Sequence, residues 1–322
     1  MKSKSYLYLL AIPLLLALFI YRAYSKTKNI PDFKNLEPTK NDNWTDGYIK
    51  ANGINFHYVT EGSGPLLLLL HGFPENWSTW REQISFLSKK YKVVALDMRG
   101  YNLSDKPKEI DDYKVNILAQ DIKAIVTAFN EKKVTLIAHD WGGAVAWQFA
   151  EDYPDMLEKL VILNSPHRVT FIKSLKTSTQ FFHSWYMIAF QLPFLPELFF
   201  SFNDYKNSLD SIKKTATYPE KAFNNNDIAY LYQGYKQKNA MTSMINYYRA
   251  IFKYKPTGIN KKIHVPTLLI WGEKDPFLTK NSIKGIEKFV PEIKIKFIPN
   301  ASHWVHKDEP ELVNEALSEF LF

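Results

Sequence analysis

The chain has 322 residues, 46% of them hydrophobic, and a formal net charge of +8. This length and hydrophobic content allow a large buried core, organised as one domain with an insertion or as two domains. The lysines are scattered rather than gathered into a basic stripe, which argues against nucleic-acid binding. The absence of cysteine excludes disulfides and thiolate metal sites.

An uncharged apolar run occupies residues 6–21 and has basic residues on both sides. Its length lies between the apolar part of a secretory signal and a full bilayer span. Ala23-Tyr24-Ser25 is a poor cleavage site, because basic residues surround it. We therefore expect residues 1–25 to be an uncleaved single-pass membrane anchor, in the endoplasmic reticulum if the source is eukaryotic. A cleaved segment would instead indicate a secreted or periplasmic protein.

Residues 26–46 are polar and predict a linker, after which short apolar runs alternate with amphipathic ones. The strands expected in this first part of the core, residues 47–165, are continuous apolar runs rather than alternating ones. Such runs, separated by helices, predict an α/β fold with a mostly parallel central sheet and helices on both faces. The expected strands are 54–62, 65–72, 92–97, 133–139 and 157–166, and the expected helices are 79–90, 116–130 and 142–151.

The alternation stops over residues 166–257, where aromatic and helical stretches carry no strand pattern. We expect this region to be a helical lid inserted into the core. Prolines and polar residues interrupt its aromatic run near residues 181–200, which disfavours a second membrane span. The strand and helix pattern returns in the second part of the core, residues 258–322. Its expected elements are strands at 265–275 and 293–300 and helices at 281–290 and 310–322.

The stretch "LIAHDWGGAVAW", residues 136–147, contains the pattern of a strand that turns sharply into a helix. In such an elbow, small residues let the backbones pass closely while the central side chain is presented for attack. That central residue is Asp140, a carboxylate where serine is more usual. We predict that Asp140 is a nucleophile.

Two further side chains follow predicted strands, Asp275 in "WGEKDPFL" and His303 in "NASHWVH". Reactive groups of an open parallel sheet collect beyond the carboxyl ends of its strands, so Asp140, Asp275 and His303 are potential neighbours. The chain order nucleophile, acid, histidine is that of the α/β-hydrolase triad. His306 is a local competitor for His303, but it precedes an acidic helix start, and we expect it to face solvent.

The stretch "LLLLLHGFPENW" places a tight turn after a strand. The backbone N–H groups of Phe73 and Trp141 are positioned there to form an oxyanion hole, and both side chains are expected to contact substrate. We assign His71 and Pro74 to building the turn. Asp97 and Arg99 are interpreted as members of structural ion pairs.

With these motifs the sequence resembles the α/β-hydrolase fold family over about residues 47–320. Within that family it is similar to the epoxide hydrolases, in particular the membrane-anchored animal branch. The resemblance implies a two-step reaction without cofactor or metal: Asp140 attacks an epoxide carbon to form an ester, and His303, oriented by Asp275, activates the water that hydrolyses it to a diol. The motifs are residues 71–74 (HGFP), 97–107, 139–143 (HDWGG), 271–275 (WGEKD) and 302–304 (SHW).

Opening an epoxide produces an alkoxide, and a preorganised phenol is a suitable acid for it. The resemblance supplies two such lid tyrosines, which match Tyr186 in "SWYMIAFQ" and Tyr248 in "NYYR". Tyr247 is the adjacent alternative to Tyr248. The expected substrate is a small lipophilic epoxide, and the expected second partner is the membrane, through the N-terminal segment.

Two other functions remain open at this point. Dehalogenases use the same aspartate chemistry with a halide leaving group. Haloalkane dehalogenases usually have asparagine where this chain has Phe73, and fluoroacetate dehalogenases place arginines where it has Trp141 and Ala144. A non-catalytic binding protein on the same fold is the other alternative.

Overall fold

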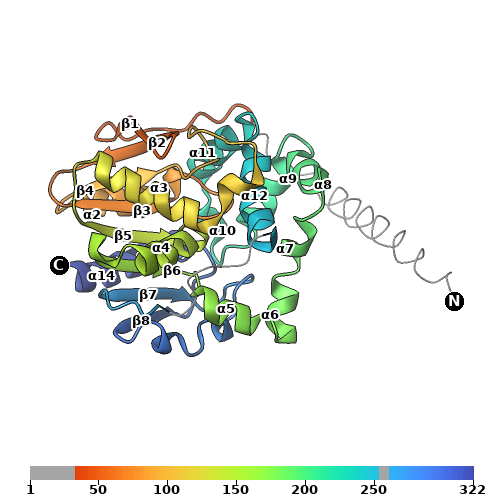
Figure 1. Cartoon of the computed structure of the whole chain (residues 1–322). Coiled ribbons are helices and arrows are strands. Elements are labelled where there is room, and N and C mark those ends of the chain that lie inside the picture. The colour runs from red at the N-terminus through yellow and green to blue at the C-terminus, as the bar shows by residue number, and fades with distance from the viewer. Residues whose placement is uncertain (1–32, 254–260) are drawn as a thin grey trace.

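The computed structural model describes residues 33–253 and 261–322. The predicted anchor, residues 1–25, lies outside these ranges. Within them, no helix combines the length and the hydrophobicity that a bilayer crossing requires. Figure 1 shows a central sheet flanked by helices, with a group of further helices at the side opposite the C-terminus.

The sheet has eight strands in the order β1-β2-β4-β3-β5-β6-β7-β8. β1 pairs antiparallel with β2, and β2 pairs antiparallel with β4. The other six strands, which are β4, β3, β5, β6, β7 and β8 in sheet order, run parallel to one another. The prediction of a mostly parallel sheet is confirmed. The strands are β1 (Thr45–Ala51), β2 (Ile54–Glu61), β3 (Leu66–Leu70), β4 (Lys92–Leu96), β5 (Val134–His139), β6 (Leu157–Leu163), β7 (Thr267–Gly272) and β8 (Ile293–Ile298).

Alternate side chains of the central strands enter two separate cores. Leu66, Leu68 and Leu70 pack with α3 (Val115–Ala128) and α4 (Asp140–Asp152) on one face of the sheet. Leu67 and Leu69 pack on the other face with α2 (Arg81–Leu87) and α14 (Pro310–Leu321). Because both faces are covered, β3 is apolar at every position, which explains its run of five leucines.

Two elements differ from the sequence expectation. β1 begins at Thr45, inside the predicted linker, and pairs along its whole length with β2. The helix expected over residues 281–290 is instead two short 3-10 turns, η5 (Lys280–Ile283) and η6 (Ile286–Lys288). Gly285 separates them with φ +82°, a left-handed conformation that a continuous right-handed helix excludes.

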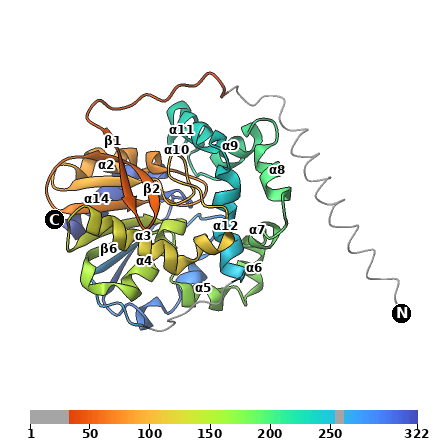
Figure 2. The same ribbon diagram turned by 45° about the horizontal axis from the view of Figure 1, so that its top comes forward.

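Between β6 and β7, the described residues form eight helices and no strand. These helices lie beyond one end of the sheet, above the carboxyl ends of the parallel strands (Figures 1 and 2). We call this group the lid helices. They are α5 (Arg168–Ser174), α6 (Ser178–His183), α7 (Tyr186–Ala189), α8 (Leu195–Ser201), α9 (Lys206–Lys213), α10 (Pro219–Ala222), α11 (Asn225–Lys236) and α12 (Ala240–Lys253).

The segment that precedes β1 is held against the lid helices. The backbone N–H of Thr39 donates to Oδ1 of Asn226 at 2.7 Å, and Nδ2 of Asn226 donates to the backbone carbonyl of Thr39 at 3.1 Å. Lys34 lies 3.4 Å from Asp204, in the turn between α8 and α9. The described chain therefore begins beside the lid, as Figure 2 also shows.

Candidate active site

Asp140 is the first residue of α4 and follows β5 directly, as the elbow pattern predicts. Its φ of +47° lies in the left-handed region, which costs a residue with a side chain about 1–2 kcal/mol. Close backbone packing enforces this strained turn. A Cβ on Gly142 would lie 2.3 Å from the carbonyl oxygen of Leu70, and a Cβ on Gly72 would lie 2.4 Å from the Cβ of Asp140.

The two carboxylate oxygens of Asp140 have different partners. Oδ1 accepts a 2.8 Å hydrogen bond from the backbone N–H of Phe73, in the loop after β3. Oδ2 lies 3.5 Å from Nε2 of His303. Trp141 follows Asp140 in the first turn of α4, where backbone N–H groups have no acceptor within the helix. The second oxygen is thus the one available to a reacting atom.

His303 is tied to Asp275 from its other ring nitrogen. Nδ1 lies 2.7 Å from Oδ2 of Asp275, so it carries the proton that is donated to this carboxylate. Oδ1 of Asp275 accepts from the backbone N–H groups of Phe277 and Leu278, at 2.8 and 2.9 Å. The acid and the imidazole are both buried, and their geometry is that of a catalytic triad with Asp140.

Sequence reasoning missed Asn164, which supports this acid. The residue follows β6 with φ +38°, and its Nδ2 donates to Oδ2 of Asp275 at 2.8 Å. Its Oδ1 accepts from the backbone N–H of Gly272 at 2.8 Å. The available signal was its position, since a polar residue directly after a buried parallel strand lies at the edge where sites form.

The charges of the triad depend on one another. Burial alone would lower the pKa of His303, but the charges and hydrogen bonds of Asp275 and Asp140 outweigh it and raise that pKa to about 10. Burial alone would raise the pKa of Asp140, but the hydrogen bond and charge of His303 dominate and lower it. The two carboxylates therefore favour the protonated form of His303, and the charge of His303 in turn favours the carboxylate form of Asp140.

Tyr186 and Tyr248 come from α7 and α12, and their ring centroids lie 5.9 Å apart. Both rings line the same two cavities as Asp140. Burial, followed by nearby acidic groups that include Asp140, raises the pKa of each phenol above its usual value near 10. Both phenols therefore remain protonated and can donate a proton next to the carboxylate.

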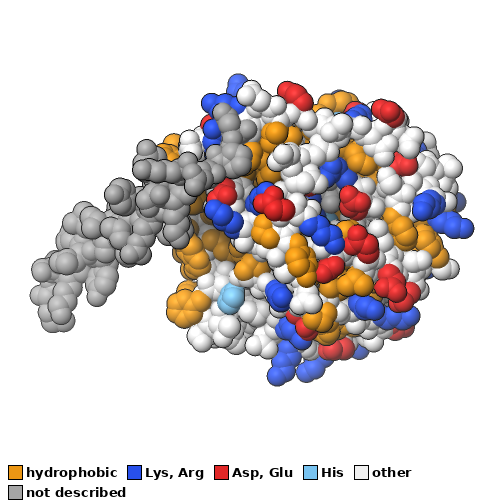
Figure 3. Space-filling model, turned by 180° about the vertical axis from the view of Figure 1, so that it is seen from behind, with side chains coloured by type: hydrophobic (Ala, Val, Ile, Leu, Met, Phe, Trp, Pro, Cys, Tyr) orange, Lys and Arg blue, Asp and Glu red, His pale blue; other side chains and the backbone are white. Residues whose placement is uncertain are grey.

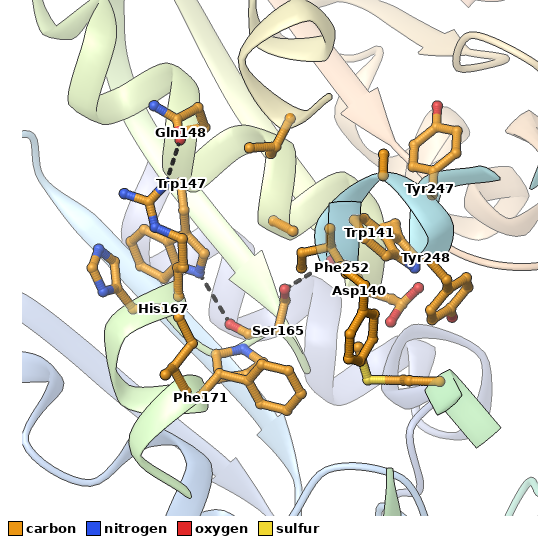
Figure 4. Close-up of a pocket in the computed structure, with 18 of the residues that line it drawn as sticks. Asp140, Trp141, Trp147, Gln148, Ser165, His167, Phe171, Tyr247, Tyr248 and Phe252 are labelled. Carbon is orange, nitrogen blue, oxygen red and sulfur yellow. Dashed lines mark hydrogen bonds between the residues drawn. The ribbon is translucent and has the colours of Figure 1, made fainter. Parts of the chain in front are cut away.

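Tyr247, the alternative to Tyr248, points elsewhere. Its hydroxyl donates a 2.7 Å hydrogen bond to the backbone carbonyl of Arg99 and is buried. Figure 4 shows this hydroxyl directed away from Asp140, whereas the ring of Tyr248 lies beside the carboxylate. The structure thus separates two neighbouring tyrosines that the sequence alone leaves open.

Two apolar cavities meet at Asp140. The smaller, of about 310 Å³, extends between α4, α5 and α12, and Trp141 lines it (Figure 4). The larger, of about 470 Å³, extends among α6, α7, α8 and α9, and Phe73 lines it. Asp140, Tyr186 and Tyr248 are shared by both. A molecule with its reacting atoms at Asp140 can therefore extend apolar groups in two directions.

The expectation that His306 faces solvent is wrong. Its ring is fully buried, stacks on Trp80 and has Nε2 2.6 Å from the hydroxyl of Thr79. That hydroxyl also donates to Glu75, whose second oxygen lies 3.3 Å from Nδ1 of His139. The acidic helix start of α14 is nearby in sequence, but the short helix α13 (Val305–Asp308) turns His306 inward.

Glu75, His139 and His306 together form a buried polar network behind the triad. Nε2 of His139 donates to the backbone carbonyl of His303 at 2.9 Å, so the network contacts the segment that carries His303 through its main chain. Each of the three side chains also offers one atom suited to a metal ion, all within 4.8 Å of one another. Sequence reasoning gave no role to Glu75 or His139.

The residues assigned to structure have structural contacts. Asp97 accepts hydrogen bonds from Asn102 and from the backbone of Trp77, and it lies 2.6 Å from His57. Arg99 forms a bidentate pair with Asp121, at 2.6 and 2.7 Å. Nε2 of His71 accepts from the backbone N–H of Met98, and the peptide before Pro74 is cis.

Comparison with known proteins agrees with this architecture. Residues 65–310 match the family described as alpha/beta hydrolase fold. This chain belongs to that family. It is 40% identical to epoxide hydrolase 3 of Xenopus tropicalis, over 85% of this chain and 77% of the frog protein. It is also 39% identical to the AB hydrolase superfamily protein YfhM of Bacillus subtilis, over 85% of this chain and 96% of that protein.

Solved structures of this family include similar enzymes. A crystal structure of a Bacillus megaterium epoxide hydrolase with a bound inhibitor superposes with a TM-score of 0.80. It is 31% identical and covers 85% of this chain and 99% of the bacterial one. The Bacillus megaterium enzyme is thus similar to this chain in sequence and in fold over most of its length.

Proposed function

We propose that this α/β-hydrolase is an epoxide hydrolase that converts a lipophilic epoxide and water to a vicinal diol. The observation that carries the proposal is the placement of Asp140: its carboxyl group lies beside the imidazole of His303 and two tyrosine rings, in largely apolar cavities. The sequence similarity to epoxide hydrolases over three quarters or more of the frog relative supports it.

In the first step, Oδ2 of Asp140 attacks an epoxide carbon and the carbon–oxygen bond of the ring breaks. The departing oxygen takes a proton from Tyr248 or Tyr186. The product is an ester of Asp140 and a β-hydroxyl group. A phenol held in a dry site suits this task, because it neutralises the alkoxide as the charge develops.

The second step follows from the loss of charge on Asp140. Once this carboxylate is an ester, His303 retains one anionic partner, Asp275, instead of two. Its pKa falls, so it gives its proton to the phenolate left by the first step, and the neutral imidazole becomes the base that takes a proton from water. Hydroxide adds to the ester carbonyl, and the N–H groups of Phe73 and Trp141 stabilise the oxyanion. The alkoxide then leaves with the remaining carboxyl proton, which gives the diol, the Asp140 carboxylate and the His303 imidazolium.

The same residue chemistry disfavours ester hydrolysis. A carboxylate attacking an ester carbonyl would form an anhydride, which is less stable than the starting ester, whereas attack at saturated carbon can expel an alkoxide or a halide. Between those two leaving groups, the paired phenols favour the alkoxide because it needs a proton. The phenyl side chain of Phe73 has no hydrogen-bond donor that could stabilise a departing halide.

The test is to trap the ester. His303→Gln should alkylate normally but hydrolyse the ester at least about 10²-fold more slowly, since the general base is removed. Incubation with a styrene-type epoxide should then add the mass of the epoxide to the peptide that contains Asp140. The matched control is His264→Gln, at an exposed histidine, which should turn over without accumulating adduct.

Two results would contradict the proposal. Label on a residue other than Asp140 would refute the nucleophile. Halide release from haloalkanes by the unmodified chain, without diol formation from any member of a small epoxide panel, would indicate a dehalogenase.

A further inference from the structure

The surface of the lid helices is unusually apolar for a protein in water. Residues 177–202 contain one charged residue, Glu197, and its carboxylate is paired with Arg249 at 2.7 and 3.1 Å. Large hydrophobic side chains of this stretch are nevertheless exposed on α6, α7 and α8 and before α8. We call six of them the lid patch: Phe181, Phe182, Ile188, Phe194, Leu195 and Leu198.

The exposure of these side chains is large. Phe194 is 77% exposed, Phe182 is 70% exposed and Leu198 is 62% exposed. In Figure 3, some exposed hydrophobic side chains are visible on the side where the lid helices lie, and others are spread over the rest of that face. Single exposed hydrophobic residues need no explanation, but six within residues 181–198 indicate a surface that another apolar phase covers.

The lid patch also borders the way into the site. Phe182 and Leu195 belong to the patch and line the larger cavity that ends at Asp140. A ligand that enters between them passes from an apolar surface into an apolar cavity. Entry from water would require the same ligand to leave the phase in which it is most soluble.

The chain before the described residues indicates which apolar phase this is. Phe33 is buried, and Lys34 lies against Asp204, six positions after Leu198. Eleven residues, 22–32, separate Phe33 from the apolar run at 6–21. Fully extended, they reach at most roughly 40 Å. An apolar run inserted in a bilayer therefore keeps the lid side of the molecule close to that bilayer.

We propose that the lid patch lies in the interfacial region of a phospholipid bilayer, so that the larger cavity opens toward the lipid and takes its substrate from it. Exposed aromatic and aliphatic side chains in a stretch with a single, paired carboxylate suit burial at the boundary between headgroups and acyl chains. The proposal names the route of the substrate and rests on the proposed function only for its activity readout.

The first experiment needs no activity. Because the chain has no cysteine, a single introduced cysteine can be spin-labelled at a chosen site. The full chain carrying Phe181→Cys or Leu198→Cys is labelled and reconstituted in vesicles of phosphatidylcholine and phosphatidylserine. The matched controls are Tyr48→Cys, on β1, and Leu312→Cys, on α14 at the opposite side of the molecule; both positions are exposed.

Lid labels should be relaxed more by oxygen, which partitions into lipid, than by a water-soluble nickel chelate. The control labels should show the reverse preference. Lid labels with the same preference as Tyr48→Cys and Leu312→Cys would overturn the proposal and would mean that residues 6–21 alone hold the protein at the membrane.

The second experiment uses turnover. The double variant Phe181→Asp/Leu198→Asp changes patch residues that line neither cavity, with Leu312→Asp as the control. Its kcat/KM for an epoxide carried in vesicles should fall about tenfold, because burying two such side chains in lipid contributes more than the 1.4 kcal/mol that corresponds to a tenfold change. Its kcat/KM for a water-soluble epoxide should stay within about twofold. Equal losses on both substrates would overturn the proposal, and no turnover of either by the unmodified chain would instead refute the proposed function.

Discussion

At the scale of single residues, Tyr247 and Tyr248 are adjacent in the sequence but have different surroundings. Tyr248→Phe removes the proposed proton donor and should slow ester formation by about 10²-fold or more. Tyr247→Phe removes the hydrogen bond to the Arg99 carbonyl and should lower stability by about 1 kcal/mol with little effect on ester formation. Single-turnover kinetics and urea unfolding of both variants measure these effects. Equal rate losses in the two variants would contradict the assignment.

A second prediction at this scale concerns His303 and pH. The folded protein raises the pKa of this group from 6.5 to about 10, so it binds the proton more tightly than the unfolded chain. The resulting stability is fully present below pH 6.5 and is lost as the pH rises through about 10. His303→Gln should therefore lower the Tm most near pH 6, and calorimetry should find the difference shrinking by about half or more toward pH 10.

The control for that measurement is His264→Gln, whose side chain is exposed. It should leave the Tm nearly unchanged at every pH. A Tm loss for His303→Gln that is constant from pH 6 to 10 would mean that this histidine is not held as an imidazolium between Asp140 and Asp275.

At the scale of elements, the junction of β5 and α4 is packed closely against β3. Gly142→Ala would place a Cβ against the backbone of Leu70, which cannot move without shifting β3. We expect this variant to lower the free energy of unfolding by about 3 kcal/mol and to displace Asp140. Gly285→Ala is the comparison, because its Cβ would meet open space and only its φ of +82° is unfavourable. That variant should lose about 1 kcal/mol.

Urea unfolding of the two glycine variants measures this contrast. Equal midpoints would mean that backbone conformation, rather than close approach of α4 to β3, accounts for the glycine at the elbow. A large loss of stability in Gly142→Ala, together with a large loss of turnover, would show that the same packing holds Asp140 in position.

At the scale of the whole molecule, the core and the lid helices divide the space around Asp140 into two cavities. Ala189→Phe narrows the larger cavity and Ala144→Phe narrows the smaller. An internal epoxide with two long arms needs both cavities, so each variant should reduce its kcat/KM about tenfold or more. A terminal epoxide with one arm can use the cavity that each variant leaves unblocked, so its kcat/KM should fall less in at least one of the two variants. Identical losses for both substrates would contradict this.

Much of the architecture follows from local patterns that need no tertiary information. Continuous apolar runs such as Leu66–Leu70 indicate strands buried on both faces, because only a parallel sheet covered twice can hold them. The residues of the proposed triad were recognisable because the carboxyl ends of parallel strands share one edge. Asp140 was recognisable from the small residues around it, since the elbow leaves little space.

What the sequence could not decide depends on direction and distance in space. Adjacent residues of α12, such as Tyr247 and Tyr248, point about 100° apart around the helix axis. Only the fold shows that the Tyr247 hydroxyl is bonded to the Arg99 carbonyl, which leaves that of Tyr248 beside Asp140. His306 was expected outside because its neighbours are acidic, but α13 turns it onto Trp80. Asn164 and the meeting of two cavities at Asp140 arise from contacts between segments more than a hundred residues apart. Only the folded chain brings such segments together, because no local pattern encodes a long-range contact.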